Sequence, residues 1–194
     1  MITRYQKAKV ETQLKAFISI INNAARLSIV DNGDIDGWIQ SEKTYSYDET
    51  KDFLMQYLLP YMKYVTLRRS DSGIGEQGAW VVLLNGSAMW IQIDRNGADI
   101  LFFADGNGDH DGPNNRFQFQ FAKFSGDSHS SLNSASFVEP YIFNWNGSEE
   151  QLKSGSQYSC YFGCTHCGYC AKLIQLNSWK IPDDYPWNWR FTDN

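Results

Sequence analysis

The four cysteines of this 194-residue chain, Cys160, Cys164, Cys167 and Cys170, fall within eleven residues near its C-terminus. In a reducing compartment, four thiolates this close together would be expected to bind zinc or an iron–sulfur cluster. In an oxidising compartment the same residues would form two disulfide bonds. The two chemistries predict different compartments, and the spacing C-x3-C-x2-C-x2-C leaves both open.

The composition suits one domain that spans residues 1–194, since 42 % of the residues are hydrophobic and can supply a core. The net charge of −5 gives no general attraction to phosphate backbones, so we expect no nucleic-acid partner. The chain has neither a signal-peptide pattern nor the apolar run of roughly 20 residues that spans a bilayer. Because the sequence starts abruptly inside a helical pattern, we expect a targeting segment to precede it.

Residues 3–30 show the spacing of one long amphipathic helix. The face expected to pack on a core consists of Val10, Leu14, Phe17, Ile18, Ile21, Ala24, Ala25 and Ser28. The face expected to meet solvent includes Lys9, Gln13, Lys15 and Asn22. The turn at 31–34 (Asp-Asn-Gly-Asp) should end the helix, because Asn and Gly tolerate the left-handed conformation of a helix cap.

A second helix is predicted from Asp48 to about Tyr64, with Asp48 as its N-cap and Pro60 as the residue that ends or kinks it. Residues 70–78 are rich in Gly and Ser and are expected to form a loop.

From residue 79 the spacing of apolar residues changes from the helical period to a period of two, which is typical of strands. Strands are predicted at 79–84, 88–94, 99–104, 117–121 and 137–143. Asn85-Gly86 indicates a type I′ hairpin between the first two. Tight turns between successive strands predict an antiparallel meander. With the long helix across one face, this gives an α+β fold.

Nucleophilic catalysis has little support in the sequence, so we expect no enzyme activity. The three histidines, His110, His129 and His166, all fall in predicted loops. The chain contains no Gly-x-Ser-x-Gly elbow and no phosphate-binding glycine pattern.

An acidic loop is the candidate metal site. Asp105, Asn107, Asp109 and Asp111 alternate with small residues, as in loops that gather oxygen ligands around calcium. The loop departs from the EF-hand pattern, because His110 replaces the glycine and Arg116 the bidentate glutamate. The alternative is a polar connection held by Asx turns, with no cofactor.

Aromatic residues gather in the tail, at Trp179, Tyr185, Trp187 and Trp189. They could form a platform for a glycan or a partner. We favour a tail that folds back to cover the sheet.

Several motifs of this chain occur together in one known family. They are the long helix from Lys9 to Asp34, Asp105-Gly-Asn107-Gly108 followed by Gly112-Pro113-Asn114, Phe162-Gly163-Cys164, Tyr169-Cys170, and Trp179-Lys-Ile-Pro182-Asp-Asp-Tyr185-Pro-Trp187. In this order they resemble bacterial type IV pilin-like proteins and type II secretion pseudopilins.

The resemblance implies a pilin fold, in which a long N-terminal helix packs on a four-stranded antiparallel sheet with a disulfide-stapled tail. Residues 1–35 would be the spine helix and 36–194 the head. An apolar strand would follow Tyr169-Cys170. Cys164–Cys170 would match the family's usual disulfide and leave Cys160 with Cys167, while nested Cys160–Cys170 and Cys164–Cys167 bonds are equally open.

The function implied is that of a non-catalytic subunit of an extracytoplasmic filament. Its partners would be copies of itself, other pilin-like subunits, and the inner membrane through a hydrophobic half-helix ahead of the chain. Two alternatives stand beside it: a zinc or iron–sulfur module at the cysteines, and an exported protein that binds a glycan or partner.

The calcium hypothesis predicts a conditional loss of stability. Replacing Asp109 and Asp111 together by asparagine should lower the melting temperature in calcium, because two ligand charges are lost. In chelator the same variant should melt like the unaltered protein. An equal shift in both buffers would rule out a calcium site in this loop.

Overall fold

The computed structural model describes residues 2–38, 46–71, 77–93, 97–107, 113–121 and 137–187. The helices are α1 (Ile2–Asn32), the 3-10 turn η1 (Ile35–Gly37), α2 (Tyr47–Phe53), the π-helical η2 (Leu54–Leu58), the 3-10 turn η3 (Leu59–Tyr61), α3 (Glu149–Lys153) and α4 (Cys170–Leu176). The strands are β1 (Tyr64–Asp71), β2 (Gln77–Leu83), β3 (Ala88–Ile93), β4 (Ala98–Phe103), β5 (Arg116–Phe121) and β6 (Val138–Pro140).

The described strands form one antiparallel sheet in the order β1-β2-β3-β4-β5-β6. The expected α+β meander is confirmed, but the sheet has six strands rather than the four that the resemblance implies. β1 lies where the sequence predicted the end of a helix and the start of a loop. It is an edge strand whose Val65 is 62 % exposed, so its sequence lacks clear alternation of apolar and polar residues. The strand expected at 137–143 is only the three-residue β6.

The second helix is shorter than predicted and has a different cap. The Ser46 hydroxyl, not Asp48, caps it by accepting a hydrogen bond from the Glu49 amide at 3.4 Å. The helix then changes to a π turn and a 3-10 turn, and Pro60 lies in the last of these as the chain leaves the helix.

The β2–β3 hairpin also differs from the predicted type I′ turn. Gly86 has a φ of +81°, but Asn85 does not adopt the positive φ that a type I′ turn needs. The Gly86 amide donates to Leu83 O at 3.1 Å and the Leu83 amide donates to Ser87 O at 2.9 Å. The connection is therefore a three-residue loop with the glycine in the left-handed position.

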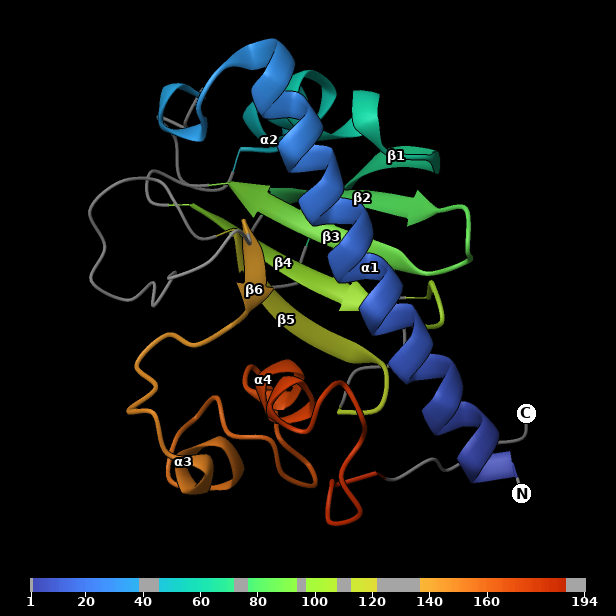
Figure 1. The fold of residues 1–194 in the computed structure, drawn as a ribbon, viewed down its shortest axis with the longest axis vertical. Helices are drawn as coiled ribbons and strands as arrows, with labels where there is room; N and C mark the ends of the chain where they lie inside the picture. Colours follow the sequence, from blue (N-terminus) through green and yellow to red (C-terminus); the bar gives the residue numbers. More distant parts are fainter. Residues whose placement is uncertain are drawn as a thin grey trace.

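α1 crosses one face of the sheet diagonally (Figure 1). Phe17 lies at the centre of this contact, with its ring centroid 4.5 Å from that of Phe102 on β4 and 5.1 Å from that of Phe119 on β5. The predicted core stripe of the helix is buried, apart from the half-buried Ile18. Gly33 follows the last turn with a φ of +78°, as expected of a helix cap. Within the described residues, we find no helix long and apolar enough to span a membrane.

Two residues that the sequence placed on the solvent face of α1 are buried instead. Gln13 is 8 % exposed and Asn22 is 4 % exposed. The Asn22 carbonyl oxygen accepts hydrogen bonds from the amides of Phe137 at 2.6 Å and Val138 at 3.0 Å. Its amide nitrogen donates to Val138 O at 3.1 Å and Ile18 O at 3.0 Å. Asn22 therefore anchors the entry of β6 to the helix.

Glu11 plays the same part for the tail. It is 9 % exposed, and its carboxylate accepts from the Ile181 amide at 3.0 Å and from Lys180 Nζ at 2.8 Å. A helix residue thus fixes the chain near its other end, 170 positions away.

The opposite face of the sheet carries a second, smaller apolar cluster. Trp80, Ala88, Trp90 and Phe103 form it, and each tryptophan is no more than 6 % exposed. The Trp90 indole donates to Ser70 O at 3.3 Å. A Cβ on Gly78 would lie 2.4 Å from that ring, so only glycine lets Trp90 lie over β2.

Replacing Asn22 by alanine should destabilise the protein by about 2–4 kcal/mol, because the buried amides of Phe137 and Val138 would lose their partner. Chemical denaturation measures the change. The matched control is Asn23→Ala, since Asn23 is exposed on the same helix and bonds side chains there. Equal losses in the two variants would contradict an anchoring role for Asn22.

Candidate functional site

The four cysteines are all oxidised, in the nested arrangement. Cys160 is bonded to Cys170 and Cys164 to Cys167, and all four are buried. The Sγ atoms of Cys164, Cys167 and Cys170 lie within 4.8 Å of one another, close enough to share a metal ion if they were free thiolates. Each sulfur instead forms a disulfide bond, and no free cysteine remains.

The disulfides fix a loop with helices on both sides. The Cys160–Cys170 bond joins the segment after α3 to the first residue of α4, and the Cys160 amide donates to Leu152 O at 2.7 Å. The resemblance implies an apolar strand after Tyr169-Cys170, and this expectation is wrong, because the segment is the helix α4. Ala171, Leu173 and Ile174 are buried on one side of α4, which is the spacing of a helix and not of a strand.

Two contacts join the segment from Pro113 to Arg116 to the C-terminal part of the chain. Tyr185 is buried, and its hydroxyl donates to Pro113 O. Arg116 Nη2 donates to the carbonyls of Thr165 at 2.5 Å and His166 at 3.1 Å. Arg116, in the place of an EF-hand's last ligand, thus holds the disulfide loop.

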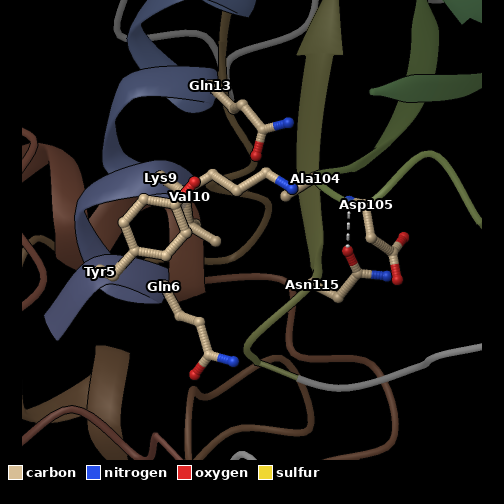
Figure 2. A pocket seen from close by; sticks show the side chains of 8 residues that line it. All are labelled: Tyr5, Gln6, Lys9, Val10, Gln13, Ala104, Asp105 and Asn115. Carbon is tan, nitrogen blue, oxygen red and sulfur yellow. Dashed lines mark hydrogen bonds between the residues drawn. The ribbon is translucent and has the colours of Figure 1, made fainter. Parts of the chain in front are cut away.

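The acidic loop is described only in part. Asp109, Asp111 and His110 lie outside the described residues, so the calcium hypothesis remains a prediction. In the described part, Asp105 Oδ1 accepts from the Asn107 amide at 2.9 Å, which is an Asx turn. The Asp105 amide donates to Asn115 Oδ1 at 2.9 Å, a bond drawn in Figure 2. This part of the loop is therefore held by an Asx turn and by the Asn115 side chain.

The tryptophan platform, the less favoured interpretation of the tail, is not formed by the part of the tail that the structure describes. Tyr185 is 5 % exposed, and Trp179 and Trp187 are half-buried against the main core. Trp189 lies outside the described residues. The tail from 179 to 187 therefore folds back on the molecule, as the favoured interpretation states.

An aromatic cluster that the sequence did not reveal lies beside the disulfide loop. Tyr158 is its centre, with ring centroids 5.3 Å from Tyr141, 6.0 Å from Phe143, 6.0 Å from His166 and 5.8 Å from Tyr169. Burial, followed by the nearby Asp99 carboxylate, raises the pKa of Tyr141 far above its ordinary value. Tyr141 is therefore a neutral phenol at physiological pH.

Gly168 allows this cluster to close. A Cβ at that position would lie 3.1 Å from the Tyr141 ring and 3.3 Å from Tyr158 Cβ. The disulfide loop and the aromatic cluster are thus one packed unit. His166 is exposed at its edge, and His129, like His110, lies outside the described residues.

The outward face of α1 is basic. Arg4, Lys15 and Arg26 are exposed along it. Residues 1–30 contain five Lys or Arg and one Glu, a net charge of +4, so the remaining residues carry −9 of the total of −5. The molecule therefore combines a cationic helix face with an anionic body.

Residues 1–189 match the model of a family described as a family of unknown function (DUF6613), and the chain belongs to that family. No curated protein and no solved structure matches the chain.

The nested disulfides predict different stability losses. In the chain-entropy model, the Cys160–Cys170 bond contributes about 3 kcal/mol and the shorter Cys164–Cys167 loop about 2 kcal/mol. Double Cys→Ala variants, one for each pair, should unfold at correspondingly lower denaturant concentrations. Peptide mapping without reduction checks the pairing, and a peptide linking Cys164 to Cys170 would contradict it.

Proposed function

We propose that this member of the DUF6613 family is a non-catalytic subunit of an extracytoplasmic filament and that its fold is a pilin fold. The observation that carries the proposal is the form of α1. It has 31 residues, about 46 Å at 1.5 Å per residue. One stripe packs on the sheet (Figure 1), and residues of the opposite face are exposed.

The charge distribution supports assembly through this helix. A cationic α1 face and an anionic body attract one another between copies, and a head-to-tail contact of this kind repeats into a filament. Exposed charges are screened over about 10 Å at 0.1 M salt. Such contacts therefore orient subunits, while an apolar segment joined to α1 would supply most of the binding free energy and hold the precursor in the inner membrane.

The contacts of the tail support the resemblance to pilin-like proteins. Pro113 of the Gly-Pro-Asn motif and Tyr185 of the Asp-Tyr-Pro motif meet where the Tyr185 hydroxyl donates to Pro113 O. Two disulfides in one short segment suit an oxidising compartment, where a filament subunit is exposed.

The proposal predicts salt-sensitive self-association. At low ionic strength the purified chain should sediment as a mixture of monomers and larger species, and high salt should return it to monomers. Arg4→Glu combined with Lys15→Glu should abolish the association, because these exposed residues are eleven positions apart and share one helix face. Analytical ultracentrifugation gives the measurement.

The control keeps the same change of charge but moves it to the body, with Lys51→Glu and Lys63→Glu, both exposed. This variant should associate as the unaltered protein does. A protein that is monomeric in every buffer, or equal effects of the two double variants, would contradict assembly through α1. In cells that make the chain, filaments sheared from the surface should contain it.

A further inference from the structure

A cavity of about 310 Å³ lies between the first turns of α1 and the β4–β5 connection. Tyr5, Gln6, Lys9 and Gln13 line it from the helix. Ala104, Asp105 and Asn115 line it from the other side. In Figure 2, Gln13 and Lys9 extend from the helix toward Ala104 and Asp105. The volume is at the lower end of that of small-molecule sites.

Gln13 marks this cavity as a place for a ligand. Its side chain is more than nine-tenths buried, and its Oε1 atom has no hydrogen-bond partner among the residues that the structure describes. The other two buried amide or carboxylate side chains on this helix, Glu11 and Asn22, both bond backbone groups. A buried carbonyl left without a donor is rare and costly, so Gln13 needs an explanation that packing does not supply.

A second acceptor lies two helix turns away. Gln6 Oε1 is also buried, and it has no hydrogen-bond partner among the described residues. Since Gln6 and Gln13 are seven positions apart, both reach the same side of α1. The cavity therefore presents two carbonyl oxygens that can accept hydrogen bonds from hydroxyl groups of a ligand.

The opposite wall is held rigidly. Asn115 is 4 % exposed, accepts from the Asp105 amide, and donates to Asn107 O at 3.3 Å. This network fixes the Asp105 backbone at the edge of the cavity. Lys9 adds an ammonium group that donates to oxygen, and the Tyr5 side chain, 73 % exposed, supplies an aromatic face at the rim.

We propose that this cavity binds one sugar ring, as the terminal or branching unit of a glycan. Ring hydroxyls donate to Gln6 Oε1, Gln13 Oε1 and the Asp105 carboxylate, and a ring oxygen accepts from Lys9. The apolar C–H face of the sugar lies on Tyr5 and on the apolar part of the wall formed by Val10 and Ala104. The residues that line the cavity do not include Trp179 or Trp187, although the centroid of the Trp187 ring lies 5.8 Å from Lys7 Nζ on the same turns of α1. The site does not depend on filament assembly.

Saturation-transfer NMR tests the proposal on the full chain, with free glucose, galactose, mannose, N-acetylglucosamine and N-acetylgalactosamine as probes. At least one of them should receive saturation, and calorimetry then gives its dissociation constant. Gln13→Met keeps the side-chain volume and removes the carbonyl. It should therefore raise the dissociation constant of that sugar by about tenfold, as for one lost hydrogen bond. Tyr5→Ala, at an exposed position, should weaken it similarly.

The matched control is Gln56→Met, an exposed glutamine on η2 outside the cavity, which should bind as the unaltered protein does. Thermal melting checks that the Gln13→Met variant is folded. Because this variant loses only an unpaired acceptor, it should melt no lower than the unaltered protein. The proposal is overturned if no sugar in the set binds. Equal binding by the Gln13→Met and Gln56→Met variants would also overturn it. So would a Gln13→Met effect on self-association alone, which would assign the cavity to a neighbouring copy.

Discussion

The burial of one stripe of α1 against the sheet is the contact on which the rest of this structure depends. Phe17 stacks on Phe102 of β4 and contacts the tilted ring of Phe119 on β5. Each fully buried side chain of this size stabilises the fold by about 1.5–3 kcal/mol. The contact determines which face of the meander is internal. It also places the polar residues of α1 against β6 and the tail, so later parts of the chain take their position from the helix.

The polar residues of the buried stripe fall into two groups. Asn22 and Glu11 bond backbone groups of β6 and the tail, so their burial is compensated within the protein. Gln13 is buried to a similar degree without that compensation. Asn22 and Glu11 therefore stabilise the fold, whereas we assign Gln13 to the binding of a ligand. The packing of α1 against the sheet in this way also positions the proposed sugar site.

Local patterns in the sequence predict the long helix, its cap and the central strands, because each produces a regular period. They miss β1, which is an edge strand with exposed Val65, and they miss α4, a helix of seven residues where the resemblance implies a strand. The polar side chains of Gln13 and Asn22 could not be placed by polarity, since a polar residue faces inward when its partners come from distant parts of the chain. The disulfide pairing and the aromatic cluster around Tyr158 also depend on contacts that form only in the folded chain.

The hydrogen bond from the Ile181 amide to Glu11 has a consequence for the order of events during synthesis. At roughly 5–20 residues per second, about 10–30 s pass between the addition of these two residues by the ribosome. Over that interval Glu11 lacks the tail amide that it binds in the folded protein, and the apolar stripe of α1 has no complete sheet on which to pack. The helix comes first in the chain but can dock fully only when the tail arrives. The nascent chain therefore keeps the main interface of α1 open until the tail has been made, and another copy or a chaperone can reach it during that time.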